Sequence, residues 1–156
     1  MRVNTHPGQT IHPEKQNFKV EQYPNCFGCG DENPHGLQLE MTIEDGELSA
    51  DFTPAPHHQG WPGIVHGGII SALLYEVMEN WTYLNGIVTM MRSMNTRLIS
   101  PTKVGRPIRA TSWQESHEGR EIYVVARLES DGKTVAEGSA CLVVLNERRR
   151  RLITEN

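Results

Sequence analysis

The stretch IVHGGIISALLYEVMENW, residues 64–81, decides the fold of this 156-residue chain. Its large apolar residues recur at helical spacing and form one wide stripe, which predicts a helix over residues 68–83. The stripe consists of Ile70, Leu73, Leu74, Val77, Met78 and Trp81. Because so wide a stripe has to be buried, we expect a single long helix at the centre of the molecule.

The opposite face of this helix is more polar. At about 100° per residue, Tyr75 and Glu76 fall on either flank of that face, and Ala72 and Glu79 lie at its centre. Glu76 is therefore the first candidate for a catalytic carboxylate.

Six strand-like runs surround the helix. Residues 37–43 and 48–52 alternate apolar and polar side chains, and Asp45-Gly46 between them predicts a hairpin. Four further runs follow the helix, over residues 87–98, 107–115, 121–129 and 134–145. The order is thus two strands, one helix and four strands. One helix can bury its stripe only against the concave face of a curved antiparallel sheet, which predicts an α+β domain.

The chain divides into three parts. Residues 1–25 are polar and lack periodicity, so we expect an N-terminal arm. Residues 26–146 form the folded domain. Residues 147–156 contain the run Arg148 to Arg151 and are expected to form a solvated basic tail.

Composition excludes several classes of function. The net charge of −4 and the isoelectric point near 6.0 provide no basic surface for nucleic acid. No apolar stretch approaches the roughly 20 residues needed to cross a bilayer, so no membrane partner is expected. The first residues lack the apolar core of a signal peptide, which favours the cytoplasm.

Three cysteines, an odd number, argue against a disulfide framework. Cys26 and Cys29 in CFGCG have the spacing of zinc ligands, but a structural zinc site needs four ligands and no second such pair exists. The histidines that could complete a site are His35, His57 and His58. We expect a tight turn with two reduced thiols, and no metal.

The start of the helix has its own chemistry. His66-Gly67-Gly68 places free backbone N–H groups at the positive end of the helix dipole, where glycine allows a ligand to approach closely. Such an end can bind the oxyanion that forms when water attacks a thioester, and a carboxylate such as Glu76 can act as base or nucleophile. The alternative is a tight turn into the helix, with Glu76 paired to a basic group.

Three segments together carry a family resemblance: CFGCGDENPHGLQL, QGWPGIVHGGIISALL and GIVTMMRSMNTRLISPTKVG. Over residues 26–145 the chain resembles the hotdog-fold acyl-CoA thioesterases of the phenylacetate-degradation type. The resemblance implies a long central helix wrapped by a curved antiparallel sheet. It also implies homodimers joined at their sheet edges, often paired into tetramers, with coenzyme A lying across both chains at the interface. Coenzyme A is then part of the substrate, and no cofactor is expected.

The resemblance also suggests roles for particular residues. His66 matches the histidine that orients the thioester, and Gly68 the glycine that offers its N–H to the thioester oxygen. Gln59 resembles the polar residue before the motif, and Thr89 matches a position that holds the attacking water. Gly67 is expected to contact the coenzyme A moiety.

Basic residues should meet the phosphates of coenzyme A. Arg97, Lys103 and Arg120, at strand ends or turns, are the candidates. Exposed loop charges without a ligand are the alternative for all three.

The chain departs from the family pattern at the acid. Active relatives have an acidic residue nine positions after the histidine, where this chain has Tyr75, and Glu76 follows one place later. The first hypothesis is a thioesterase with Glu76 as base or nucleophile. The second is a non-catalytic hotdog protein that binds an acyl thioester or small apolar ligand, with Tyr75 as a pocket wall. A weaker third is an acyl-thioester dehydratase.

We also predict that residues 87–98 contribute to a dimer interface, because an open sheet edge has to be covered.

Overall fold

Six strands and two α-helices make up residues 23–154, the part of the chain that the computed structural model describes. The predicted order of two strands, one helix and four strands is confirmed. The elements are β1 (Met41–Glu44), β2 (Glu47–Phe52), the 3-10 helix η1 (Pro56–His58), α1 (Gly67–Leu84), β3 (Thr89–Leu98), β4 (Ile108–Glu118), β5 (Glu121–Ser130), β6 (Lys133–Val144) and α2 (Glu147–Thr154). Most of the predicted arm, residues 1–25, lies outside the described part.

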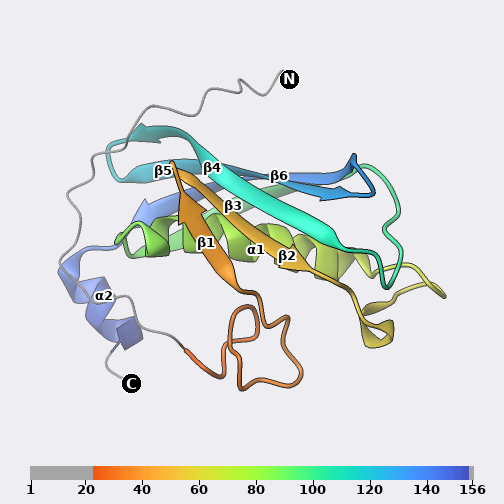
Figure 1. The fold of residues 1–156 in the computed structure, drawn as a ribbon. Coiled ribbons are helices and arrows are strands. Elements are labelled where there is room, and N and C mark those ends of the chain that lie inside the picture. Colours follow the sequence, from red (N-terminus) through yellow and green to blue (C-terminus); the bar gives the residue numbers. More distant parts are fainter. Residues whose placement is uncertain (1–22, 155–156) are drawn as a thin grey trace.

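All six strands belong to one antiparallel sheet with the order β1-β2-β4-β5-β6-β3. Helix α1 lies along one face of this sheet and contacts every strand (Figure 1). The chain before β1 passes on the side of α1 that faces away from the sheet (Figure 1). The α+β architecture of one central helix and one antiparallel sheet, expected from the sequence, is confirmed.

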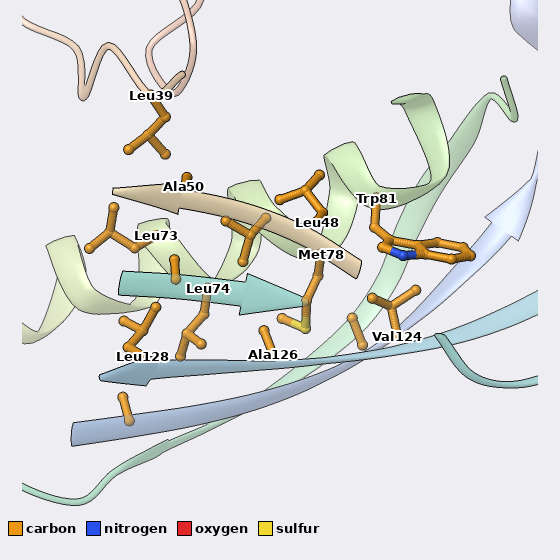
Figure 2. Close-up of a cluster of buried hydrophobic side chains, with 14 of the residues drawn as sticks. Leu39, Leu48, Ala50, Leu73, Leu74, Met78, Trp81, Val124, Ala126 and Leu128 are labelled. Atoms are coloured by element: carbon orange, nitrogen blue, oxygen red, sulfur yellow. The ribbon is translucent and has the colours of Figure 1, made fainter. Parts of the chain in front are cut away.

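The predicted apolar stripe is the face of α1 that enters the core. All six residues of the stripe are buried, and Figure 2 shows Leu73, Leu74, Met78 and Trp81 directed toward the strands. Gly138 of β6 leaves room for this packing, because a β-carbon there would lie 3.1 Å from the Cε atom of Met78. The helix is therefore held by side-chain burial along most of its length.

Two further contacts fix how α1 lies on the sheet. The indole Nε1 of Trp81 donates to the carbonyl of Gly46, 2.9 Å away in the β1–β2 turn. The hydroxyl of Ser112, buried on β4, donates to the carbonyl of Val77 at 2.5 Å. Both bonds join the second half of the helix to β1, β2 and β4, on one side of the sheet.

The first strand is shorter than predicted. It begins at Met41, because Gln38 has φ of 51° and interrupts the extended backbone. Leu37 and Leu39 are still buried, but their N–H groups donate to the carbonyls of Phe27 and Gly28. The segment before β1 thus pairs with the loop that contains Cys26 and Cys29.

The expected basic tail is a short helix. Asn146 accepts a hydrogen bond from the backbone N–H of Arg149 at 3.0 Å, which caps α2. Arg151 pairs with Glu147 one turn earlier. Arg148, Arg149 and Arg151 are exposed, as expected. In the described part of the chain, no helix has the length and apolarity needed to span a membrane.

The two edges of the sheet differ. Strand β1 is only four residues long, a common way to limit an edge. Strand β3 has ten residues and pairs only with β6 within the described chain. Along it, Met90 and Leu98 are 56% and 55% exposed, and Met94 is exposed as well. This long edge, on which three exposed apolar side chains alternate with polar ones, is the strand predicted to form a dimer interface.

Candidate active site

His66 caps the start of helix α1. Its backbone is extended, and its Nδ1 accepts a hydrogen bond from the N–H of Gly68 at 2.9 Å. With Nδ1 as acceptor, the neutral ring carries its proton on Nε2 and can donate it to a ligand. The ring also packs against Gly60, where a β-carbon would lie 3.2 Å from Cδ2. The resemblance's expectation that His66 orients a ligand is compatible with this placement.

The N–H of Gly68 is therefore not free in this structure, although the sequence suggested it as the group offered to a thioester oxygen. The N–H of Gly67, the first helical residue, has no hydrogen-bond partner among the described residues. It points out of the positive end of the helix, where an anion is stabilised. Gly67 is the better candidate for the oxyanion donor.

Gly67 also lies beside the edge strand. A β-carbon on Gly67 would be 3.1 Å from the Cδ1 atom of Leu98, the last residue of β3. The helix start and the far end of β3 are thus neighbours at the surface of the chain.

Gln59 shapes the loop before the helix. Its side-chain carbonyl accepts a hydrogen bond from the N–H of Gly63 at 3.1 Å, and its backbone forms a bridge with Val65. Gln59 is exposed and close in sequence to His66, so it supports the loop from which the histidine projects. Among the described residues the amide nitrogen of Gln59 has no acceptor, so it can donate to a ligand.

A carboxylate that the sequence hypothesis did not assign lies further along the helix. The Oε1 atom of Glu79 accepts a hydrogen bond from the Thr89 hydroxyl at 3.4 Å, and its Oε2 is buried with no hydrogen-bond partner in the described chain. The Thr89 hydroxyl is also 2.6 Å from that of Thr82. The structure thus brings Thr89 to Glu79, and these residues form an acid–hydroxyl pair.

Burial raises the pKa of Glu79 from its ordinary value of 4.5 to about 7. The Thr89 hydroxyl opposes this rise, and the nearby charge of Glu76 adds to it. A carboxylate with a pKa near neutrality is suited to general-base catalysis. The helical pattern already placed Glu79 at the centre of the polar face; the missing signal was that the start of β3 covers that face.

Glu76 occupies a different environment. Its Oε2 accepts a hydrogen bond from the Asn80 side chain at 3.1 Å, and burial raises its pKa. The loop with the two cysteines lies directly over it, since a β-carbon on Gly28 would fall 1.9 Å from the carboxyl carbon of Glu76. Tyr75, on the other flank, is 40% exposed, and burial of the rest raises the pKa of its hydroxyl.

The cysteine loop also bears on metal binding. The thiols of Cys26 and Cys29 and a carboxylate oxygen of Glu76 all lie within 4.8 Å of one another. Burial raises the pKa of Cys29 to about 12, and a hydrogen bond to Cys26 contributes. Within the described residues, no histidine belongs to a group able to hold a metal, so the three histidines considered from the sequence are not partners of this pair.

The three basic candidates lie at two ends of the sheet. Lys103 is exposed and forms a backbone bridge with Ile64, two residues before the helix cap. Arg97 precedes Leu98 on β3 and pairs with Glu137 at 2.8 Å. Arg120 is at the other end, where its guanidinium donates to the carbonyl of Val144. Lys103 and Arg97 are therefore near the helix start, and Arg120 is not.

One chain does not bring the two halves of the site together. At about 1.5 Å per residue, Glu79 is about 18 Å along α1 from Gly67, and Glu76 is about 13.5 Å away. A thioester carbonyl bound at the helix start is therefore out of reach of either carboxylate of the same chain.

Comparison with known proteins identifies the family. Residues 57–143, more than half of the chain, match the sequence profile of the acyl-CoA thioesterase N-terminal domain family. Acyl-coenzyme A thioesterase THEM4 of Mus musculus is 27% identical over 141 residues, which cover 87% of this chain and 59% of the mouse protein.

Solved structures share the fold. A crystal structure of a thioesterase superfamily protein, 28% identical, superimposes with a TM-score of 0.69 over 73% of this chain and 60% of that protein. A thioesterase-like, phenylacetic acid degradation-related protein from Ralstonia eutropha JMP134 is 24% identical, with a TM-score of 0.64 over 69% of this chain and 86% of that protein. The chain spans less than two thirds of the length of the mouse relative and of the first of these structures.

Proposed function

The chain belongs to the family of acyl-CoA thioesterase N-terminal domains, and from this premise we propose that it hydrolyses acyl-coenzyme A thioesters to the free acid and coenzyme A. The proposal needs an oxyanion donor and a base on opposite sides of one thioester carbonyl. The free N–H of Gly67 and the carboxylate of Glu79 have these properties, but they are too far apart within one chain.

The position of these groups along β3 supports a site shared by two copies. Leu98, at one end of the strand, contacts Gly67, and Thr89, at the other end, contacts Glu79. If two β3 strands pair antiparallel about their midpoint, Leu98 of one copy lies across from Thr89 of the other. The oxyanion donor of one copy then lies beside the base of the second. The observation that carries the proposal is that Leu98 and Thr89, at opposite ends of β3, contact Gly67 and Glu79 respectively.

The same pairing covers the exposed edge of the sheet. Met90, Met94 and Leu98 are exposed in the single chain, and β3 offers a row of unpaired backbone groups. We therefore propose a homodimer joined through β3, which gives two equivalent sites. Pairing of dimers into tetramers stays a prediction of the family resemblance.

In the proposed reaction, the Nε2–H of His66 and the N–H of Gly67 donate to the thioester oxygen. Glu79 of the second copy takes a proton from water, and the water oxygen attacks the carbonyl carbon. The tetrahedral oxyanion formed is stabilised by the helix start. Its collapse breaks the carbon–sulfur bond, and the departing thiolate takes a proton from Glu79. Thr89 orients the Glu79 carboxylate.

Binding of coenzyme A is expected on the same side as the helix start. Lys103 and Arg97 flank that end and can pair with phosphate groups. Arg120 lies at the opposite end of the sheet from the helix start of its own chain, so it can serve a site only through the second copy.

The three free cysteines suit a reducing compartment, and we propose the cytoplasm as the location.

Hydrolysis of a panel of acyl-CoA thioesters by the purified chain tests the proposal. Glu79→Gln keeps the size of the side chain and removes its charge, so kcat is expected to fall about 10²–10⁴-fold. Glu76→Gln, measured alongside, tests the hypothesis drawn from the sequence, and Tyr75→Phe removes only a hydroxyl. If Glu79→Gln retains turnover, Glu79 is not the base; if Glu76→Gln then abolishes turnover while the chain stays folded and the Cys26→Ser variant stays active, Glu76 is the base.

Two other results would replace the proposal. Tight binding of thioesters without hydrolysis by the wild-type chain identifies the non-catalytic binding protein, with Tyr75 in the place of the family acid. Hydration of enoyl thioesters without hydrolysis of saturated ones identifies a dehydratase.

A further inference from the structure

The loop CFGCG, residues 26–30, has a fixed conformation over helix α1. The N–H of Gly30 donates to the carbonyl of Cys26 at 3.0 Å, and the N–H of Leu37 donates to that of Phe27 at 2.7 Å. Gly28 is buried against the carboxyl group of Glu76, where any side chain would collide. The two thiols are therefore held in place above the helix by backbone bonds on both sides of the loop.

Three metal-binding groups meet at this point. The Sγ atoms of Cys26 and Cys29 and one oxygen of Glu76 lie within 4.8 Å of one another, and all three residues are partly buried. For three atoms at that spacing, some point lies within about 2.8 Å of all of them, so a small closure brings them to zinc–ligand distances of about 2.0–2.3 Å.

The surroundings of Glu76 favour a cation. Its carboxylate takes part in no ion pair among the described residues, although it is largely buried. Asn80 donates to Oε2 at 3.1 Å and leaves Oε1 without a hydrogen-bond donor in the described chain. A side-chain amide that orients one oxygen of a carboxylate ligand is a common outer-shell arrangement in metal sites.

We propose that Cys26, Cys29 and Glu76 form a zinc site that fastens the cysteine loop to helix α1. Two thiolates and one carboxylate suit zinc better than magnesium or calcium, which bind through oxygen alone. The three protein ligands are one fewer than the four of a closed structural zinc site, so water would occupy the fourth position. The site does not depend on the proposed hydrolysis, because Glu79 and Gly67 are not among its ligands.

Zinc binding can be measured directly on the 156-residue chain, reduced and stripped of metal. We expect one Zn²⁺ per chain by elemental analysis after dialysis, and a rise in melting temperature on zinc addition. Cobalt substitution should produce thiolate-to-cobalt charge-transfer absorption. Cys26→Ser, Cys29→Ser and Glu76→Gln should each weaken zinc affinity at least about 100-fold, and Asn80→Ala about 10–100-fold.

Cys141 provides the matched control, since it is also free and partly buried but lies on β6. Cys141→Ser should retain full zinc affinity, the cobalt absorption and the melting shift. The proposal is overturned if the reduced wild-type chain binds no more zinc than the Cys26→Ser/Cys29→Ser double variant. It is also overturned if Glu76→Gln leaves the zinc affinity unchanged. Circular dichroism of each metal-free variant verifies that it is folded.

Discussion

At the scale of the residue, the proposed chemistry depends on the ionisation of Glu79. Its pKa of about 7 results mainly from burial, and the Thr89 hydroxyl opposes the shift. Only the ionised carboxylate can take a proton from water, so kcat/KM is expected to rise with pH and to level off above about pH 7.

Thr89→Val tests the pairing of these two residues. Valine keeps the shape of the buried side chain but removes the hydroxyl that lowers the pKa of Glu79. The rising limb of the pH–rate profile should therefore move to higher pH. Thr89→Ser retains a hydroxyl and should leave the limb near its wild-type position. An identical limb in all three proteins would show that Thr89 does not act on the base.

Glu79 should also make stability depend on pH. Its pKa is about 7 in the folded chain and close to 4.5 when unfolded, so between these values the folded chain binds more protons. The free energy of unfolding is then expected to decrease as the pH rises from about 4.5 to about 7. Urea unfolding across that range should show a smaller decrease for Glu79→Gln than for the wild type. Equal decreases would mean that Glu79 is not buried as described.

At the scale of the element, the role of the start of helix α1 can be tested by a substitution that leaves the rest of the helix intact. Gly67→Pro removes the proposed oxyanion donor, and proline is tolerated at the first helical position. His66 has ψ of 133°, which suits a residue before proline. Turnover is expected to fall about 10²–10³-fold, as for the loss of other oxyanion donors.

Gly67→Ala is the matched control, because it keeps the N–H and adds only a methyl group beside the flexible end of Leu98. It should retain most of the wild-type rate. If both variants hydrolyse thioesters equally well while helical content is unchanged, the N–H of Gly67 has no role in the reaction.

The elements themselves were largely predictable, because their signals are local. Six apolar residues at helical spacing specify the buried face of α1, and Asp45-Gly46 specifies the first hairpin, with φ of 50° and 81°. The start of β1 was not predictable, since Leu37 and Leu39 alternate like a strand. Their N–H groups instead donate to a loop ten and eleven residues earlier, which is a tertiary contact.

The site was predictable only in part. His66 and the helix start follow from sequence, but which glycine N–H is free depends on the direction of the His66 ring. The spacing from His66 favoured Glu76 as the base, because Glu76 is next to the position of the family acid. The different surroundings of Glu76 and Glu79 arise from the cysteine loop and from Thr89, which reach the helix from distant parts of the chain.

At the scale of the whole molecule, the proposed homodimer depends on the open edge of β3. A lysine at Met94 places a charge in the middle of this edge, where strand pairing would bury it. Light scattering should show a dimer for the wild type and a monomer for Met94→Lys, with turnover lost in the latter. Thr42→Lys, on the exposed edge strand β1, should remain dimeric and active. A dimeric, active Met94→Lys protein would place the interface elsewhere.

The central claim is that each active site takes its oxyanion donor from one chain and its base from another. Mixing Gly67→Pro with Glu79→Gln, each nearly inactive alone, tests it most directly. In a mixed dimer, one of the two sites has both groups intact. After subunit exchange, verified by mass spectrometry, the mixture should regain about a quarter of wild-type activity, since half of the dimers are mixed and each has one working site. A mixture that exchanges subunits but stays as inactive as its parents would contradict the shared site.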